Sequence, residues 1–381
     1  MYRKNSGFYI TVAFITLLIF SFLTIYAASA TKKQLNASRI SARAAVLYEP
    51  ETDTFLFEKN ADERLPMAST TKIMTAIVAI ENSSLDEQVA VDDSAIGTEG
   101  SSAYLKSGDI LTMEELLYAL MLSSANDAAV AIACHVSGSI EEFAALMNEK
   151  AEELGLVDTH FSNPHGLDAE DHYTTARELA IIAKEALSYD ILKEISSTYK
   201  KSFITEERSR TYVNHNKLLH KYDGAIGLKT GYTKKCGRCL VGAAERDGLC
   251  FITVTIDAPS DWNDHALMLD FGYDTLEKVM LADVGEYSYE LGVVGGKGEK
   301  ITVTNTTSLS YIKDRNKGVI DRHVRLVQFA EAPVTTSDTL GEVIFTLDGR
   351  EIGRISLHPC ECVEKAKSEG LLKKLKSIFD G

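Results

Sequence analysis

The sequence lacks several patterns that mark common classes of protein. Its nine histidines include no His-Glu-x-x-His pair, and Cys236-Gly-Arg-Cys239 has no second cysteine pair at zinc-site spacing, so a metalloenzyme is disfavoured. Internal repeats and long low-complexity tracts are missing, which argues against solenoids and propellers. With a net charge of −15 and no stripe of basic and aromatic residues, the chain is a poor candidate for nucleic-acid binding. We expect no cofactor, no metal and no nucleic-acid partner.

Apolar runs long enough to span a membrane are missing after residue 30. Before it, Arg3 and Lys4 precede an apolar run over residues 8–26, and Ala28-Ser29-Ala30 has the small-x-small pattern of a signal-peptidase site. We therefore predict a signal peptide over residues 1–30. The alternative is an uncleaved membrane anchor, since the run is nearly long enough to span. Either outcome places the remainder outside the membrane, on the extracytoplasmic side.

The order of strand-like and helical patterns predicts the fold class. With 381 residues and 45% apolar content, the chain has room for two domains with real cores. Strand patterns come first, a long helical block follows, and further strands and a closing helix complete the series. This order predicts an α/β domain in which helices flank an antiparallel sheet and a helical lobe is inserted. The predicted strands are 44–48, 54–57, 226–232, 240–244 and 250–256; the predicted helices are 69–80, 111–122, 127–135, 139–154, 175–187 and 262–273.

The composition shifts after about residue 278 to short strand patterns with Gly-rich turns. We predict a catalytic domain over residues 31–277 and a small all-β domain over residues 278–360. In the remaining segment, 361–381, a basic amphipathic helix is predicted to lie on an anionic membrane surface. The alternative is a helix docked on its own protein. The apolar face of this helix comprises Leu371, Leu372, Leu375, Ile378 and Phe379.

Three short motifs stand in order along the chain: Ser69-Thr70-Thr71-Lys72, Ser124-Ala125-Asn126 and Lys229-Thr230-Gly231. Each is weak alone, but together they describe a site for acyl transfer through a serine ester. We predict Ser69 as the nucleophile at a helix start, where the dipole favours an oxyanion. Lys72, one turn later, is the predicted base. Burial and a second cation, Lys229, would lower its pKa enough for that role.

The other two motifs are predicted to serve the substrate. Ser124 can relay a proton to the leaving group, and Asn126 can hold a substrate amide. The third motif lies on a predicted strand, beside which a substrate peptide can add as an extra strand. There Thr230 and the positive charge of Lys229 would hold a terminal carboxylate, and Gly231 would allow close backbone approach.

The backbone N–H of Tyr232 is predicted to complete an oxyanion hole with that of Ser69.

The trio of motifs is the one known from penicillin-binding proteins and class A β-lactamases. Three further segments, Ser101–Asp109, Asn163-Pro-His-Gly-Leu167 and Gly227–Thr233, resemble the D-alanyl-D-alanine carboxypeptidases, the low-molecular-mass penicillin-binding proteins; Asp261-Trp-Asn-Asp-His265 resembles their Gram-positive branch. This resemblance covers residues 40–360 and implies a β-lactamase/transpeptidase-like fold. It also implies hydrolysis of the terminal D-Ala-D-Ala bond of peptidoglycan stem peptides, which trims cell-wall precursors and limits cross-linking, and covalent acylation by β-lactam antibiotics at Ser69.

By the same resemblance, His165 lies near the site, with a structural loop histidine as the alternative. Cys236 departs from the family pattern, in which small apolar residues are usual at this position. This departure leaves open a redox influence on the loop after Tyr232. Buried thiols or an incidental disulfide with Cys239 are the plainer interpretation.

Rival functions are a β-lactamase, a penicillin sensor, and a wall-binding protein with a dead site. No Glu-x-x-Leu-Asn segment stands between Asn126 and Lys229, and every motif residue is intact, which favours the peptidase. We expect it at the outer face of the cytoplasmic membrane.

Overall fold

The computed structural model describes residues 35–204 and 208–367. The predicted signal peptide and the apolar face of the predicted C-terminal helix therefore lie outside the described residues. The chain up to Ile40 is one unit and the chain from Ser41 is another. The described part of the first unit holds a single 3₁₀ turn, η1 (Ala37–Arg39), whose start is capped by the Asn36 side chain.

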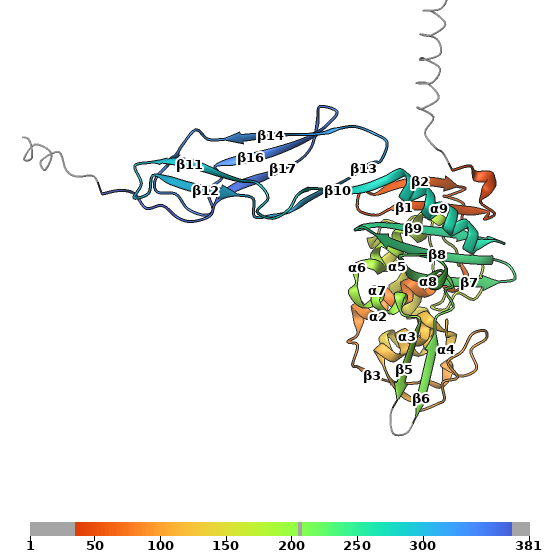
Figure 1. Ribbon diagram of the computed structural model, residues 1–381. Helices are drawn as coiled ribbons and strands as arrows, with labels where there is room; N and C mark the ends of the chain where they lie inside the picture. The colour runs from red at the N-terminus through yellow and green to blue at the C-terminus, as the bar shows by residue number, and fades with distance from the viewer. Residues whose placement is uncertain (1–34, 205–207, 368–381) are drawn as a thin grey trace, which may run out of the picture. The chain divides into compact units, whose positions relative to one another are not determined.

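A five-stranded antiparallel sheet forms the centre of the first half of the second unit, in the order β2-β1-β9-β8-β7 (Figure 1). The β8–β9 connection is the tight Asp247-Gly248 turn that the sequence predicts, and both residues have positive φ. Strand β7, which carries the third motif, is an edge strand of the sheet. The strands are β1 (Ala44–Glu49), β2 (Thr54–Lys59), β7 (Ala225–Thr233), β8 (Gly237–Arg246) and β9 (Leu249–Ile256).

Helices cover both faces of this sheet. Because side chains alternate along β9, its two faces meet different partners. Thr253 and Thr255 contact the buried His265 of helix α9 (Asp261–Thr275) through their hydroxyls. On the other face, Ile252 and Val254 belong to the large core shared with the helical lobe, and helix α6 (Ala176–Ser188) packs against β1 and β9 there.

The helical lobe stands between β2 and β7 in the chain, as predicted. Thr175 caps the start of α6 as predicted, with its Oγ1 accepting from the Glu178 N–H at 3.1 Å, but the Glu178 carboxylate accepts from the Val157 and Asp158 N–H groups and so does not complete the predicted capping box. Thr112 and Ser139 cap two further helices in the same way. The remaining elements are η2 (Ala68–Thr71), α2 (Lys72–Asn82), β3 (Gln88–Ala90), η3 (Asp93–Ala95), β4 (Ile110–Thr112), α3 (Met113–Leu122), α4 (Asn126–Ser137), α5 (Ile140–Glu153), α7 (Asp190–Ser197), β5 (Lys200–Ile204), β6 (Ser209–Val213) and α8 (Leu218–Lys221).

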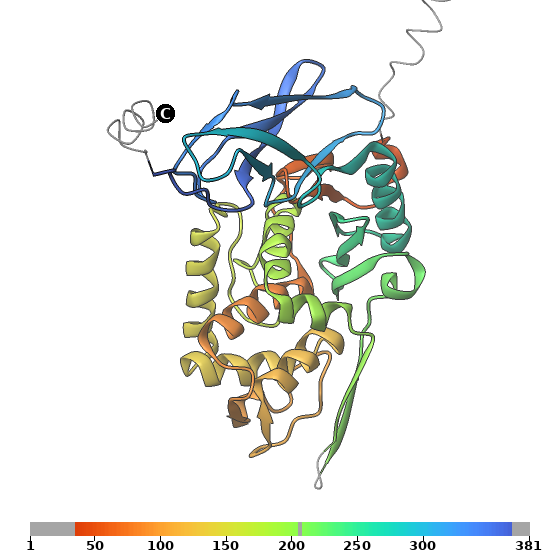
Figure 2. The same ribbon diagram turned by 60° about the vertical axis from the view of Figure 1, so that its left-hand side comes forward.

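Two boundaries differ from the prediction. The first turn of the predicted helix at residue 69 is the separate 3₁₀ turn η2, so the α-helix begins at Lys72. The helix predicted from residue 111 begins at Met113, because residues 110–112 pair with β3 as strand β4. The sequence analysis also missed α7 and the β5–β6 hairpin, a two-stranded arm that is easily followed in Figure 2.

The second half of the unit has its own core of buried side chains around Val303, Val343 and Leu357. Its main sheet has the order β14-β16-β17-β12-β11-β15, and β10 pairs with β13. The predicted boundary after residue 277 falls inside β10, and the two-domain division stays a prediction. The strands are β10 (Leu276–Ala282), β11 (Ser288–Val294), β12 (Lys300–Thr304), β13 (Leu309–Asp314), β14 (Ile320–Leu326), β15 (Ala330–Glu331), β16 (Gly341–Leu347) and β17 (Arg350–Pro359).

The beginning of the predicted C-terminal helical segment is extended. Residues 361–367 contain no helix, and Val363 and Lys365 form isolated bridges with Val334 and Gly296. The prediction of a helix from residue 361 is therefore wrong for these seven residues, whose backbone groups pair with the β-rich half instead. No single helix in residues 35–204 and 208–367 is long and apolar enough to cross a membrane, although the bent pair α4 and α5 passes by length and composition only.

Candidate active site

The predicted nucleophile and base lie side by side. Ser69 is in η2 and Lys72 begins α2, so the two side chains are three residues apart on one helical turn. Lys72 Nζ lies 2.9 Å from Ser69 Oγ. It also lies 2.6 Å from Asn126 Oδ1 and 2.5 Å from the carbonyl oxygen of His165. The amine therefore has three polar neighbours, contributed by three separate segments of the chain.

Those neighbours fix where the lone pair of a neutral amine would point. Asn126 Oδ1 and the His165 carbonyl only accept hydrogen bonds, so they take the two N–H groups of a neutral lysine. The remaining position faces the Ser69 hydroxyl, which can donate. Lys72 is fully buried. Burial first, and the charge of Lys229 second, hold the pKa of Lys72 well below its usual range, while Asp127 acts in the opposite direction.

Lys229 is the second buried lysine of the site. Burial alone lowers its pKa to about 7, and its Nζ donates to the Thr230 carbonyl at 3.1 Å. A proton on Lys229 disfavours a proton on Lys72 through like-charge repulsion. The predicted second cation is therefore close enough to act on Lys72, but at neutral pH it is only about half charged.

Titration of Lys229 predicts a pH dependence of stability. An unfolded lysine has a pKa of about 10.4, so between pH 7 and about 10.4 the folded state binds fewer protons than the unfolded state. The Lys229 contribution to the free energy of unfolding therefore rises with pH in this window, by at most about 1.4 kcal/mol per pH unit. Denaturant titrations of wild type and Lys229→Met at pH 7, 8 and 9 would test this. The free energy of unfolding of the wild type minus that of the variant should increase with pH. The exposed Lys235→Met is the matched control, and curves for Lys229→Met that stay parallel to wild type would contradict the prediction.

The second motif lies at the break between α3 and α4. Ser124 has a φ of 58°, in the left-handed region that is strained for a residue with a side chain. Ala68, directly before the nucleophile, has a φ of 48°. Such conformations persist where the surrounding structure imposes them, and they gather at active sites. Ser124 and Ser69 both line the same cleft, the arrangement that the predicted proton relay needs.

Asn126 is more deeply engaged than its predicted role requires. Its Oδ1 accepts from Lys72, its Nδ2 donates to the Glu99 carbonyl at 2.5 Å, and its backbone N–H donates to the Ser101 carbonyl at 2.7 Å. The side chain is 4% exposed. It holds the Lys72 amine in place and joins it to the segment that contains Glu99 and Ser101. Its predicted role in holding a substrate amide stays a prediction.

The Asn163–Leu167 loop packs against the nucleophile turn. A methyl group at Gly166, which has a φ of 86°, would lie 2.0 Å from the Ala68 carbonyl oxygen, so only glycine fits. His165 contributes its carbonyl to Lys72. Its imidazole accepts from the Leu167 N–H at 3.2 Å, and burial followed by the Lys72 charge lowers its pKa to about 3, so the ring is neutral. His165 thus lies beside the base, as the resemblance implies.

Strand β7 lies directly on the nucleophile turn. A methyl group at Gly231 would lie 3.1 Å from both the Ser69 nitrogen and the Ala68 Cβ. Glycine at this position therefore allows strand β7 to approach the nucleophile turn closely. The predicted pairing of the Tyr232 and Ser69 N–H groups as oxyanion donors stays a prediction.

A cleft of about 350 Å³ opens over these groups. It contains a cation that the sequence analysis missed, Arg238, which lies opposite Tyr232 in the β7–β8 ladder. Its Nη2 donates to both carboxylate oxygens of Asp261 at 2.9 and 2.8 Å, and its guanidinium stacks 5.7 Å from the Trp262 ring centre. The sequence analysis used the Asp261–His265 segment only as a family resemblance, although its Asp261 and Trp262 are the residues that contact Arg238. The cleft is lined by Ser69, Ser101, Ser124, His215, Lys217, Thr230, Gly231, Tyr232, Arg238, Cys239, Asp261 and Trp262.

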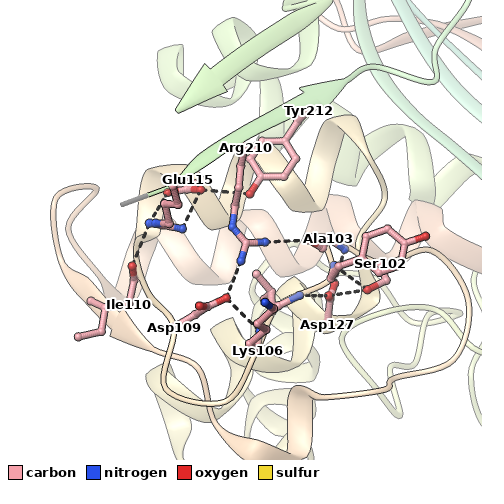
Figure 3. A network of polar contacts seen from close by, with 12 residues as sticks. Ser102, Ala103, Lys106, Asp109, Ile110, Glu115, Asp127, Arg210 and Tyr212 are labelled. Atoms are coloured by element: carbon pink, nitrogen blue, oxygen red, sulfur yellow. Dashed lines mark hydrogen bonds and ion pairs between the residues drawn. The ribbon is translucent and has the colours of Figure 1, made fainter. Parts of the chain in front are cut away.

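The loop that carries Ser101 into the cleft wall is held by a polar network (Figure 3). Asp127 accepts from the Ser102 hydroxyl at 2.6 Å and from the backbone N–H groups of Ala103 and Leu105. Arg210, on the β5–β6 arm, donates to the Ala103 carbonyl at 2.8 Å. The network therefore links the arm to the cleft wall.

The described residues thus form a serine hydrolase site of the Ser–Lys type on an α/β scaffold. The chain belongs to the D-alanyl-D-alanine carboxypeptidase family, whose model matches residues 28–260. The chain is 34% identical to D-alanyl-D-alanine carboxypeptidase DacF of Bacillus subtilis, covering 95% of this chain and 96% of that one. It is 30% identical to DacC of Escherichia coli, covering 91% and 90%.

Solved structures confirm the predicted fold class. Penicillin binding protein 5 from Haemophilus influenzae superposes with a TM-score of 0.63 at 26% identity, covering 87% of this chain and all of that one. The carboxypeptidase DacD from Francisella tularensis gives 0.62 at 26% identity, with 86% and 94% coverage. The chain is a serine-type D-Ala-D-Ala carboxypeptidase, a hydrolase, as predicted.

Proposed function

We propose that the chain hydrolyses the terminal D-Ala-D-Ala bond of peptidoglycan stem pentapeptides through an ester on Ser69, and that penicillins acylate the same atom. The observation that carries this proposal is the set of contacts around the Lys72 amine. Two fixed acceptors leave only the Ser69 hydroxyl to meet the lone pair of that amine. A base that is buried and neutral before substrate arrives can take the serine proton as attack occurs.

Acylation follows from this geometry. The Ser69 proton passes to Lys72 while Oγ attacks the carbonyl carbon between the two D-alanines. The backbone N–H groups of Ser69 and Tyr232 hold the oxyanion. The C–N bond then breaks, and the proton on Lys72 reaches the leaving amine through Ser124. D-Alanine departs and leaves the ester.

Deacylation uses the same groups with water as the nucleophile. Lys72 takes a proton from water, hydroxide adds to the ester carbonyl, and the C–O bond to Ser69 breaks. The proton returns to Ser69 Oγ, and the tetrapeptide stem leaves. Removing the terminal D-alanine trims the precursor and limits cross-linking.

A β-lactamase is the second candidate, and the lining of the cleft disfavours it. Among the described residues that line the cleft, Asp261 is the single carboxylate, and it is bound to Arg238. A class A β-lactamase uses a glutamate to activate the deacylating water. Nothing among these lining residues supplies such a group, so we expect a penicilloyl ester on Ser69 to persist.

The direct test is to incubate the purified chain with a pentapeptide stem and, separately, with nitrocefin. We expect release of free D-alanine and slow nitrocefin turnover. Mass spectrometry after penicillin treatment should place the adduct on the tryptic peptide that contains Ser69. Rapid nitrocefin hydrolysis without D-alanine release would instead identify a β-lactamase.

Arg238 is predicted to bind the terminal carboxylate of the substrate. Lys229 is 1% exposed and does not line the cleft, whereas Arg238 does and is more than one-third exposed. Arg238→Gln should raise KM for the pentapeptide about 10- to 100-fold, the loss expected for a hydrogen bond to a charged group. Substrate with a C-terminal amide is the control, because it has no carboxylate for the arginine to bind.

The exposed Lys235→Gln changes the net charge by the same amount on the same hairpin and should leave KM unchanged. An equal effect of Arg238→Gln on the acid and the amide would contradict carboxylate recognition.

We also propose that the chain is exported and acts at the outer face of the cytoplasmic membrane. The charged, apolar and small-residue pattern of residues 1–30 supports export, and the amphipathic pattern of residues 371–379 supports attachment. Fractionation of cells producing the full chain and a version ending at residue 367 would test both. Loss of membrane association in the shorter chain is the expected result.

A further inference from the structure

Two buried cysteines meet at the hairpin that carries the third motif. Cys236 lies in the turn after β7 and Cys239 lies in β8. Their exposed fractions are 2% and 1%, and their sulfur atoms are 2.9 Å apart. This contact is closer than ordinary sulfur packing and within 1 Å of the length of a disulfide bond, about 2.05 Å.

The hydrogen bonds around the pair define both thiol protons. Cys236 Sγ donates to the Pro66 carbonyl at 3.1 Å, so the Cys239 thiol is the donor in the contact between the two sulfurs. The turn is held further by the Cys236 N–H, which donates to Thr233 Oγ1 at 3.0 Å. The two side chains therefore point at each other from a turn that is already fixed.

The pair adjoins the catalytic cleft on two sides. Cys239 is the ladder partner of Gly231 and lines the cleft. Cys236 contacts the carbonyl of Pro66, two residues before the strained Ala68 and three before the nucleophile. A covalent bond between the two sulfurs would thus fix the hairpin at the point where β7 contacts the nucleophile turn.

We propose that Cys236 and Cys239 form a reversible disulfide. This bond would act as a staple, that is, a covalent cross-link that fixes the β7–β8 turn. The reaction is exchange with an external disulfide, such as oxidised glutathione. The two thiols and the external disulfide give the Cys236–Cys239 bond and two external thiols. The S–H bonds of both cysteines and the external S–S bond break, the electron pair passes to the external sulfurs, and those sulfurs take the two protons.

A metal site does not explain the pair. Within residues 35–204 and 208–367, no group of three or more histidine, cysteine, aspartate or glutamate side chains is placed to hold a metal ion. The hydrogen bond with Cys239 and burial both raise the pKa of Cys236. Because the thiolate is the attacking species, the exchange should speed up as pH rises.

Trypsin provides a direct readout, since it cuts after Lys235, Arg238 and Arg246. The two cysteines then fall on separate peptides, 236–238 and 239–246. The full chain is equilibrated in glutathione buffers from fully reduced to fully oxidised, and free thiols are alkylated. The tryptic peptides are then analysed by mass spectrometry. We expect the two peptides to appear joined and two hydrogens lighter than their sum in oxidising buffer, and separately alkylated in reducing buffer.

Stability is the second readout. The oxidised chain should melt about 2–5 °C above the reduced chain, as expected for a short loop closed by a disulfide. The difference should vanish in Cys236→Ser and persist in the control Cys360→Ser/Cys362→Ser, which removes two exposed thiols. Neither readout depends on peptidase activity, so they test the disulfide separately from the proposed function.

Separate alkylation of the two peptides in fully oxidising buffer would overturn the proposal, as would pairing of either cysteine with a different one. A joined pair without a melting shift would overturn its role as a staple.

Discussion

Replacement of Ser69 by alanine is expected to abolish both D-alanine release from a pentapeptide stem and labelling by fluorescent penicillin. The change removes the atom that forms the ester, and no neighbouring group replaces it. Among the described residues, Ser124 and Thr230 of the other two motifs also line the cleft with hydroxyl groups, but both lie on different segments of the chain, and Ser124 is held in a left-handed conformation. Residual turnover should fall below the detection limit, because covalent catalysis loses its nucleophile.

The fold of this variant should persist, since Ser69 makes a single side-chain hydrogen bond, to Lys72, among the contacts of the described residues. Equal melting temperatures for wild type and variant, within about 2 °C, would establish this. Thr70→Ala is not a suitable control because its hydroxyl donates to the Met67 carbonyl at 2.6 Å. Tyr104→Phe is a preferable control, because the Tyr104 side chain is exposed. Continued labelling of the Ser69→Ala variant would refute the assignment of the nucleophile.

Replacement of Lys72 by methionine is expected to reduce the acylation rate about 10²- to 10⁴-fold, the usual contribution of a general base. The apolar side chain fills similar space in a fully buried position. It leaves Asn126 Oδ1 and the His165 carbonyl without their donor, which costs about 1–3 kcal/mol each. Stopped-flow measurement of penicillin acylation separates this loss of rate from any loss of folded protein.

Chemical rescue distinguishes a base from a structural support. Lys72→Ala leaves a space beside Ser69 that a small primary amine can enter, and added ethylamine should restore part of the acylation rate. Rescue should increase with pH as the added amine loses its proton. A Lys72→Met variant that acylates within tenfold of wild type would contradict the role of Lys72 as the base.

The three motifs predicted the residues at the centre of the site, because the type and local spacing of the residues within each motif indicate their chemical roles. Ser69 and Lys72 lie one helical turn apart, so their contact follows from local geometry alone. Gly231 was predicted to allow close approach, and the structure places it against Ser69. The substrate-binding roles of Thr230 and Tyr232 remain predictions that the assays above address.

The rest depended on distant pairings that one sequence does not reveal. Asn126 was expected to face the substrate, but its amide joins Lys72 to Glu99, which stands 27 residues earlier. The Arg238–Asp261 pair joins β8 to the start of α9 across 23 residues. In both cases the sequence shows which residue is present but does not show which distant residue it contacts.

Short elements escaped prediction for a different reason. Helix α7 has eight residues and the strands β5 and β6 have five each. Helix α7 is shorter than the window over which a helical period is recognised, although Leu192 and Ile195 are buried on one side of it. Strands β5 and β6 are mostly exposed and polar, so they lack the apolar alternation of a half-buried strand. The β5–β6 arm is held instead by side-chain contacts of Arg208 and Arg210 with Glu115 and Asp109, and arginines at such spacing give no signal in the sequence.

Under the proposed function, the three contacts of the Lys72 amine also couple the reactivity of Ser69 to folding. Residues 69–165 must fold together before the Lys72 amine has both of its acceptors. Residue 229 must also be in place before the charge of Lys229 can act on Lys72. Under the proposed function, a nascent polypeptide that has emerged only through the helical lobe is expected to carry an unreactive Ser69. If Ser69 is acylated by penicillin as proposed, the rate at which fluorescent penicillin labels a refolding chain would report when these distant segments first come together.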